Sequence, residues 1–284
     1  MKKLSLILAI LCPLLAFAQQ TETQYLSGKG LGDTKTWKFH CSDGMNSGKW
    51  TKIEVPSQWE LQGFGEYSYG RWYTIKGAKP PVEVGTYRTT FTIPSTWKNK
   101  QIAIVFEGSM TDTEVKVNGQ LAGEIHQGAF NRFSYDITDK LKSGKNQLEV
   151  VVSKESSDKN VNAAERKADW WIFGGIYRPV YLEAKPLVNI ERIAVNAKAD
   201  GSLDADVFTT PLEDGYTIAA TIQPASGKPT RSTLRDDLFS KQTGKLNGGT
   251  DHTVHFKWDN VEVWNTETPN LYNLRLELLD KEQK

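Results

Sequence analysis

Short alternating runs broken by turn residues constrain the fold of this chain more than any other feature. Apolar and polar residues alternate in Tyr87–Ile93, Thr113–Val117 and Asn146–Val152, and Pro94 ends the first run. Asn118-Gly119 follows the second run and favours a tight hairpin, because both residues tolerate positive φ. Further strands are expected at Ile102–Phe106, Leu121–Ile125 and Phe133–Ile137. The first half therefore predicts an antiparallel, jelly-roll β-sandwich.

The second half continues the pattern with a new set of strands. These are expected at Ile190–Val195, Ala205–Phe208, Tyr216–Ile222, Thr253–Trp258 and Leu274–Leu278. The polar stretch Arg231–Gly249 is interpreted as a long hairpin arm, and the longest helical candidate is only Asn160–Ala168. The sequence thus predicts an all-β chain with a first domain over residues 19–186 and a second over 187–284.

Residues 1–18 have the features of a secretory signal peptide. Lys2 and Lys3 precede the mainly apolar run Leu4–Phe17, and Ala16-Phe17-Ala18 forms a small-x-small cleavage site. The apolar run is too short for a membrane span. We therefore expect an exported protein, located in a bacterial periplasm, that does not bind a membrane once the signal is removed.

The charge balance of the mature chain argues against a nucleic-acid partner. Removing residues 1–18 takes away two lysines and no acidic residue, which leaves 33 basic residues (35 less two) against 34 acidic ones. A near-neutral chain lacks the basic excess that binding to nucleic acid or to an anionic membrane requires.

Metal and disulfide chemistry find little support in the sequence. Cys41 is the one cysteine after residue 18, so no disulfide can form within the mature chain. The four histidines do not have metal-ligand spacing; His252 and His255, three apart in a strand, are expected on opposite faces. Charged strand residues such as Asp112 and Glu114 are interpreted as solvated.

The segment Asp169–Val180 brings aromatic, glycine and charged residues together in one short stretch. It contains four aromatic rings, a Gly pair at Gly174-Gly175, the carboxylate of Asp169 and the guanidinium of Arg178. Aromatic rings cover the apolar face of a pyranose and a carboxylate accepts its hydroxyl groups. The residues alone leave two readings open, a sugar-contacting loop and a buried aromatic corner of the sandwich.

A second aromatic cluster precedes the first long strand. It lies in a Gly-rich loop whose length indicates either an ordered functional loop or packing over the sandwich. Its members are Trp59, Phe64, Tyr67, Tyr69, Arg71, Trp72 and Tyr73.

Several motifs occur in an order and spacing that point to one family. Asp169, Trp171, Gly175, Ile176 and Arg178 match the pattern Asp-x-Trp-x-x-Ser-Gly-Ile-x-Arg, with Gly174 in place of the small residue. Supporting matches are Val55–Glu60, Gly85–Phe91, Phe106–Gly108, Val117–Gly119 and Phe133–Thr138, followed later by Trp264, Pro269, Leu271 and Tyr272. The chain resembles the N-terminal part of glycoside hydrolase family 2, the β-galactosidase and β-glucuronidase family.

The resemblance implies a jelly-roll sugar-binding domain and an immunoglobulin-like domain that lacks its last strand. In the family, a (β/α)8 barrel with two catalytic glutamates follows, so no catalytic residue is expected here. The resemblance assigns substrate binding to Asp169 and Trp171, with Arg71 and Trp72 as further candidates. Arg178, Gly174 and Gly175 are expected to brace the loop. In β-galactosidases an Asn of the earlier loop contacts the sugar, whereas the nearest positions here are Gly70 and Arg71.

The family also suggests which partners to expect. Asp169 is a candidate for holding a monovalent cation, and the full-length enzyme is a candidate for binding a monovalent or divalent cation; no other cofactor is expected. The partner is a carbohydrate, a β-galactoside or related glycan, and a homo-oligomer is expected for the full-length protein.

The sequence therefore predicts the non-catalytic N-terminal portion of an exported, β-galactosidase-like glycosidase. Three alternatives stay open: a β-glucuronidase-like fragment, a free-standing carbohydrate-binding module and an inactive remnant.

Overall fold

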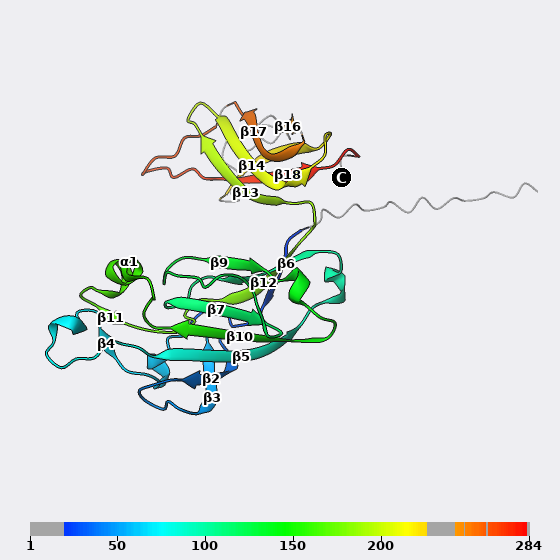
Figure 1. The fold of residues 1–284 in the computed structure, drawn as a ribbon. Coiled ribbons are helices and arrows are strands. Elements are labelled where there is room, and N and C mark those ends of the chain that lie inside the picture. The colour runs from blue at the N-terminus through cyan, green and yellow to red at the C-terminus, as the bar shows by residue number, and fades with distance from the viewer. Residues whose placement is uncertain (1–19, 226–241, 247, 260, 283–284) are drawn as a thin grey trace, which may run out of the picture. The chain divides into compact units, whose positions relative to one another are not determined.

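The structure, a computed structural model, describes residues 20–225, 242–246, 248–259 and 261–282. Residues 1–18, predicted to be a signal peptide, lie outside the described residues. Two compact units follow each other along the chain, Thr21–Pro186 and Leu187 onward (Figure 1).

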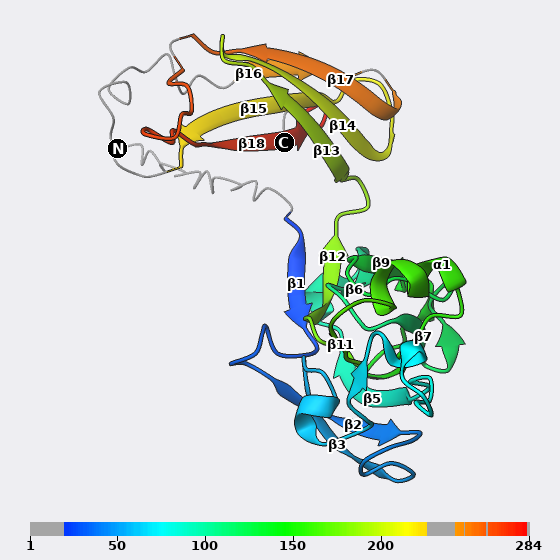
Figure 2. The same ribbon diagram turned by 90° about the vertical axis from the view of Figure 1, so that its left-hand side faces the viewer.

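The first unit is an antiparallel β-sandwich. Its four-stranded sheet has the order β1 (Glu22–Tyr25), β12 (Val180–Lys185), β6 (Gln101–Phe106) and β9 (Phe133–Asp136). Its six-stranded sheet has the order β3 (Trp50–Val55), β2 (Lys35–Cys41), β5 (Val84–Thr92), β10 (Lys145–Ser153), β7 (Asp112–Val117) and β8 (Gln120–Leu121). Figure 2 shows β1 beside β12, where the first strand of the unit meets its last. The predicted jelly-roll sandwich is confirmed.

Alternation along the strands places one side chain in two inside the sandwich. In β10, for example, Leu148, Val150 and Val152 are fully buried while Gln147 and Glu149 face outward. The core that results contains large side chains from both sheets, among them Phe39, Tyr87, Phe91, Ile104, Phe106, Val115 and Leu182. Burial of these apolar surfaces is the main stabilising contribution to the unit.

The Asn118-Gly119 hairpin has the backbone geometry that its sequence predicts. Asn118 has φ of 53° and Gly119 has φ of 84°, and the two residues join β7 to β8. The expected strand Leu121–Ile125 is wrong beyond its first residue, because β8 ends at Leu121. A Cβ at Gly123 would lie 2.4 Å from the Tyr135 ring, so the chain passes close to that ring. Regular pairing with β7 is interrupted there and returns as a single bridge between His126 and Thr113.

Helical segments in the first unit are short. The expected helix at Asn160–Ala168 is found as one α-turn, α1 (Lys159–Val161), that continues into a π-helical segment η5 (Asn162–Arg166). The Asp158 carboxylate caps α1 by accepting a hydrogen bond from the amide of Asn160. Single 3₁₀ turns occur at η1 (Glu60–Gln62), η2 (Trp72–Thr74), η3 (Ser95–Trp97) and η4 (Thr138–Lys140). No helix among the described residues is long and apolar enough to cross a bilayer.

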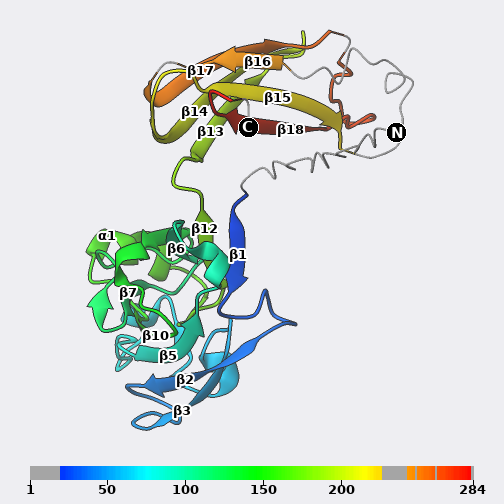
Figure 3. The ribbon, with the colours of Figure 1, turned by 90° about the vertical axis from the view of Figure 1, so that its right-hand side faces the viewer.

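The second unit is a smaller sandwich of two three-stranded sheets (Figure 3). One sheet has the order β13 (Ile190–Ala197), β14 (Ser202–Leu212) and β17 (Gly249–Lys257). The other has the order β16 (Gln242–Lys245), β15 (Thr217–Pro224) and β18 (Tyr272–Leu279). Both sheets contribute to one core, which includes Val207, Ile218, Ile222, Phe256 and Trp258. The predicted all-β class is confirmed in this unit as well.

The hairpin arm expected at Arg231–Gly249 falls mostly outside the described residues. Its described end, β16, pairs with β15 from Thr217↔Lys245 to Ala220↔Gln242.

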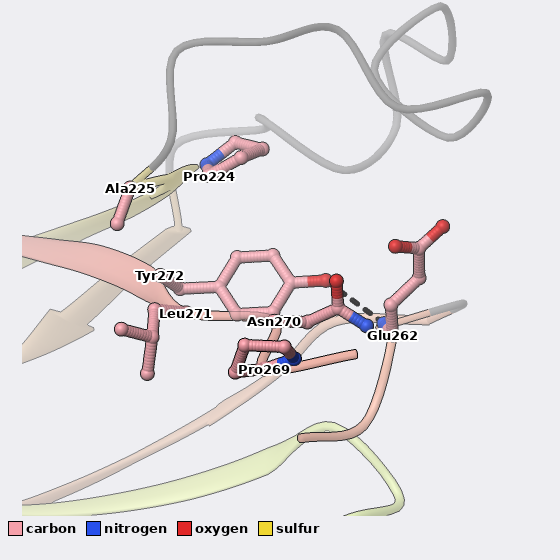
Figure 4. A pocket seen from close by; sticks show the side chains of 7 residues that line it. All are labelled: Pro224, Ala225, Glu262, Pro269, Asn270, Leu271 and Tyr272. Atoms are coloured by element: carbon pink, nitrogen blue, oxygen red, sulfur yellow. Dashed lines mark hydrogen bonds between the residues drawn. The ribbon is translucent and has the colours of Figure 1, made fainter. Parts of the chain in front are cut away.

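The late strand motif of the second unit surrounds a small hollow of about 230 Å³ (Figure 4). Pro269, Leu271 and Tyr272 line it together with Pro224, and the Tyr272 hydroxyl accepts a hydrogen bond from the amide of Glu262 at 2.8 Å. Tyr272 therefore ties the segment before β18 to the start of that strand.

Candidate functional site

Two loops that are distant in sequence meet at one end of the first unit (Figure 1). The two-residue strand β11 (Trp171–Ile172) pairs with β4 (Ser68–Tyr69), so that Trp171 lies opposite Tyr69. The amide of Gly70 also donates to the carbonyl of Trp170 at 2.8 Å. The structure thus joins the aromatic cluster of residues 59–73 to that of residues 169–180.

Asp169 lies at the exposed rim of this junction. One of its carboxylate oxygens accepts a hydrogen bond from the Tyr69 hydroxyl, and the other lies 3.9 Å from Nη1 of Arg71. The hydrogen bond to Asp169 is the main reason that the pKa of Tyr69 is raised. The Asp169 side chain remains 71% exposed, so its oxygens are held in place yet can accept further hydrogen bonds from a ligand.

Aromatic rings flank Asp169 on the same junction. The Trp171 ring meets the rings of Tyr67 and Tyr69 edge-on, at centroid distances of 6.3 and 5.5 Å. Trp171 is 55% exposed and Trp170 45%. Exposed indole surface next to a carboxylate matches the needs of a pyranose, which has an apolar face and a hydroxyl edge.

Trp72 belongs to a neighbouring group of side chains. Its indole N–H donates to the Glu155 carboxylate at 3.2 Å, and its ring packs edge-on against Tyr73. The structure therefore brings Asp169, Trp171 and Arg71 together, while the polar edge of Trp72 is directed at Glu155.

A buried ionic cluster lies on the inner side of the segment that contains Gly174. Nζ of Lys154 lies 2.9 Å from Glu60 and 3.1 Å from Glu83, and these three side chains are 0%, 0% and 5% exposed. Nζ also donates to the carbonyl of Glu66 at 2.5 Å. Burial raises the pKa of Glu60, although Lys154 and the amide of Gly174 act in the opposite direction.

The buried cluster is linked directly to the Gly pair of the loop. Both oxygens of the Glu60 carboxylate accept from the amide of Gly174 at 3.1 Å. Arg166 is also buried and donates to the carbonyl of Phe173; burial lowers its pKa. The backbone on both sides of the Phe173–Gly174 bond is therefore fixed by charged groups that water does not reach.

The two glycines are required by sterics. A Cβ at Gly174 would lie 2.0 Å from the Trp59 ring, and Gly175 has φ of 120°, outside the range that other residues readily adopt. A Ser at position 174, as in the family pattern, would collide with Trp59 here.

Arg178 contacts backbone on the far side of the loop. Its Nη1 donates to the carbonyls of Phe130 at 3.1 Å and Glu107 at 3.3 Å, and its guanidinium lies over the Tyr177 ring. The contacts are those of a side chain that ties the loop to neighbouring segments.

The residues that sequence reasoning missed are the buried charges. Glu60, Glu83, Lys154 and Arg166 were not singled out, although Lys154 had a detectable signal. It follows Leu148, Val150 and Val152 in the same alternating phase, which places it on the inward face. Tyr69, which holds Asp169, was noted only as one member of the aromatic cluster.

The aromatic cluster of residues 59–73 divides into two groups in the structure. Trp59 and Phe64 are buried in the core, whereas Tyr67 and Tyr73 are about half exposed.

One further expectation is corrected by the structure. Asp112 was interpreted as a solvated strand residue, but it is only 7% exposed. Its carboxylate accepts from the amide and hydroxyl of Ser157 at 2.7 and 2.9 Å. Asp112 therefore stabilises the turn before α1, since a buried carboxylate requires such partners.

The surroundings of Asp169 do not form a cation site. Its carboxylate faces a phenol and the guanidinium of Arg71, which itself supplies positive charge. Among the described residues no group of three His, Cys, Asp or Glu side chains is placed to hold a metal ion. The candidate role of Asp169 as a cation ligand does not fit these neighbours.

Comparison with known proteins gives two adjoining family matches. The profile described as "Glycosyl hydrolases family 2, sugar binding domain" matches residues 37–186, and that described as "Glycosyl hydrolases family 2" matches residues 188–284. The first covers more than half of the chain.

Curated relatives carry the names of two activities. A "Beta-galactosidase" of Psychromonas ingrahamii is 27% identical over 255 residues, covering 86% of this chain and 24% of the relative. A "Putative beta-glucuronidase" of Formosa agariphila is 30% identical over 243 residues, covering 84% of this chain and 27% of the relative. The chain thus spans about a quarter of the length of these relatives.

Solved structures share the fold. A β-glucuronidase of Bacteroides uniformis superposes with a TM-score of 0.64 at 23% identity, over 93% of this chain and 31% of that one. A putative β-galactosidase of Bacteroides fragilis gives 0.63 at 22% identity, over 93% and 41%.

Proposed function

The chain belongs to glycosyl hydrolase family 2, and from this premise we propose that it is the non-catalytic N-terminal part of an exported β-glycosidase with β-galactosidase-like activity. Its role in that enzyme is to supply a sugar-contacting rim, while a catalytic domain supplies the reacting carboxyl groups. Two curated relatives named for β-galactosidase and β-glucuronidase activity support the class of substrate, a β-linked glycan.

One observation carries the proposal, the exposed but positioned carboxylate of Asp169. Tyr69 and Arg71 orient it, and more than half of the Trp171 surface next to it is open to solvent. In this arrangement the carboxylate accepts hydrogen bonds from sugar hydroxyl groups, and the indole covers the apolar face of the same ring. A positioned partner reduces the entropy that is lost when the sugar binds.

The chain itself is not proposed to hydrolyse anything. Retaining glycosidases need two accessible carboxyl groups about 5 Å apart. Glu60 and Glu83 come close to each other through Lys154, but they are buried and engaged with Lys154 and with backbone amides. Their geometry is that of a structural cluster, so catalysis is assigned outside this chain.

A specific observation favours a β-glucuronidase-like enzyme as the second candidate. Arg71 is 54% exposed and lies beside Asp169, at a position where a guanidinium can bind the carboxylate of a uronic acid. A galactoside has no carboxylate for Arg71 to bind.

Export is part of the proposal and rests on residues 1–18 alone. The basic start, the apolar run and the Ala16-Phe17-Ala18 motif support secretion to the periplasm.

The test is to express the gene together with the catalytic domain and to assay nitrophenyl β-galactoside and β-glucuronide. The β-galactosidase proposal predicts faster turnover of the galactoside and no turnover by residues 19–284 alone. Faster turnover of the glucuronide, lost in Arg71→Gln, would favour the second candidate instead. Turnover by residues 19–284 alone would contradict the non-catalytic role.

Calorimetry on residues 19–284 tests the alternative that the chain is a free-standing carbohydrate-binding module. Heat of binding with galactosides or glucuronides, in a gene that encodes no catalytic domain, would favour that alternative. Absence of heat with either sugar would remove it.

A further inference from the structure

The outward face of the six-stranded sheet carries an unusual row of charges. The strand register places Lys52 opposite Lys38 and Lys38 opposite Arg88. The row then continues through Glu149 to Lys116. Three cationic side chains therefore stand next to one another on β3, β2 and β5, on a face where alternation directs them toward solvent.

The charges at the β10 and β7 end of this row form ion pairs, and we call this the balanced end. The lysines at the β3 and β2 end do not, and we call that the unbalanced end. Arg88 pairs with Glu149 at 2.6 Å, and Lys116 pairs with Glu114 at 2.5 Å. For Lys38 and Lys52 the structure records no ion pair with any described carboxylate, and both are exposed. Like charges directly opposite each other on neighbouring strands are destabilising. The next outward carboxylate on β3, that of Glu54, accepts hydrogen bonds from the Thr34 and Thr36 hydroxyl groups and forms no ion pair with either lysine.

An exposed indole borders the unbalanced end. Trp50, the first residue of β3, is 46% exposed, and its ring is oriented by the Arg88 guanidinium 4.4 Å from its centroid and by the His40 ring at 5.6 Å. About half of the indole surface is therefore left for a ligand.

These side chains line one open hollow of about 720 Å³. Its lining includes the cations of Lys38, Lys52, Arg88 and Lys145 and, among the described residues, no Asp or Glu. Thr90 and Gln147, which face each other across β5 and β10, add hydrogen-bonding groups to the same hollow.

From this combination we propose that the hollow binds a chain of acidic sugars, whose carboxylate or sulfate groups neutralise Lys38 and Lys52 while a sugar ring packs on Trp50. A neutral glycan does not need the cations of Lys38 and Lys52, and an anion without an apolar face does not need the indole. The near-neutral net charge of the chain argues against a nucleic acid as occupant. The site is independent of the role proposed for Asp169.

The test uses affinity electrophoresis of the full chain through gels that contain dextran sulfate, polygalacturonate or dextran. The first two present sulfate and carboxylate groups, and dextran is the uncharged match of dextran sulfate. The proposal predicts retardation by at least one acidic polymer and none by dextran. Lys38→Gln and Trp50→Ala are each expected to weaken retardation about tenfold. Lys116→Gln, from the balanced end of the same row, is the matched control and is expected to bind as the unchanged protein does.

A second readout separates loss of binding from loss of folding. Because Lys38 stands between two cations, Lys38→Gln is expected to melt at the same or a higher temperature while it binds less. Equal retardation by dextran, no retardation by either acidic polymer, or full binding by Trp50→Ala would each overturn the proposal. Equal losses in Lys38→Gln and Lys116→Gln would show a diffuse charge effect and overturn it as well. Single-stranded DNA retarding the chain independently of Trp50 would contradict the choice of occupant.

Discussion

The first unit handles charge in two opposite ways within one loop region. Beneath the loop, Lys154 lies between Glu60 and Glu83 where water does not reach. At the rim, Asp169 and Arg71 stand 3.9 Å apart with more than half of each side chain exposed. The two groups are connected by one short stretch of backbone, since Glu60 binds the amide of Gly174 and Asp169 lies five residues earlier.

The difference shows which group sets shape and which can take part in binding. A buried charge that loses its partner is strongly destabilising, so the buried cluster holds the backbone in one arrangement. An exposed pair contributes little to stability and is free to exchange partners with a ligand. We infer that the cluster positions the rim and that the rim contacts the sugar.

The largest effect is expected from removing the central cation. Lys154→Met leaves the buried carboxylates of Glu60 and Glu83 without their ion-pair partner, so we expect the free energy of unfolding to fall by about 3–5 kcal/mol. Urea unfolding measures this. Lys116→Met removes a partly exposed lysine of an ion pair and serves as control, with a change within about 0.5 kcal/mol. Equal losses of stability in Lys154→Met and Lys116→Met would contradict the claim that buried charges matter more for stability than exposed ones.

A smaller loss of stability is expected when a methyl group is added where the loop packs closely against the core. Gly174→Ala places a methyl group against Trp59 and should cost about 1–3 kcal/mol. Gly32→Ala is a suitable control, because a Cβ there meets nothing within 4 Å. Thermal melting compares the two, and a stable Gly174→Ala protein would show that the loop is not fixed against Trp59.

We expect the buried carboxyl group of Glu60 to make stability depend on pH. Burial raises the pKa of Glu60 above its unfolded value of about 4.3. A raised folded pKa means that its contribution to stability is fully present below about pH 4.3 and is lost as pH rises through the folded pKa. The unfolding free energy of the unchanged protein, minus that of Glu60→Gln, is therefore expected to decrease from pH 4 upward. An increase over this range would reverse the sign assigned to Glu60.

The smallest effect on stability is expected at the rim. Asp169→Asn should change the free energy of unfolding by less than about 0.5 kcal/mol, because both members of its ion pair are exposed. Urea unfolding beside Lys154→Met gives the comparison in one experiment. A loss above about 2 kcal/mol would make Asp169 part of the support rather than of the rim.

Sequence reasoning succeeded where alternation and turn chemistry act locally. The all-β class, most strands and the Asn118-Gly119 hairpin follow from period-two patterning and from positive φ at two residues. The strand expected at Leu121–Ile125 was wrong beyond Leu121, and a local pattern does not reveal the approach of the Tyr135 ring to Gly123.

The residues that position the candidate site could not be predicted from local sequence patterns. Asp169 and Trp171 were recognised through a motif, but Tyr69, their neighbour across β4 and β11, comes from 100 residues earlier. Lys154, Glu60 and Glu83 are also far apart in sequence, and charged residues are usually assigned to the surface. Only the fold shows that their charges compensate one another.

The most direct test of the account is the ratio kcat/KM for Asp169→Asn in the enzyme that includes its catalytic domain. The account predicts a fall of about tenfold or more on the preferred aryl glycoside, with the melting temperature unchanged. Asp139→Asn, another exposed aspartate paired with a cation, should leave kcat/KM unchanged. An Asp169→Asn enzyme with unchanged kcat/KM would contradict the claim that this rim contacts the sugar.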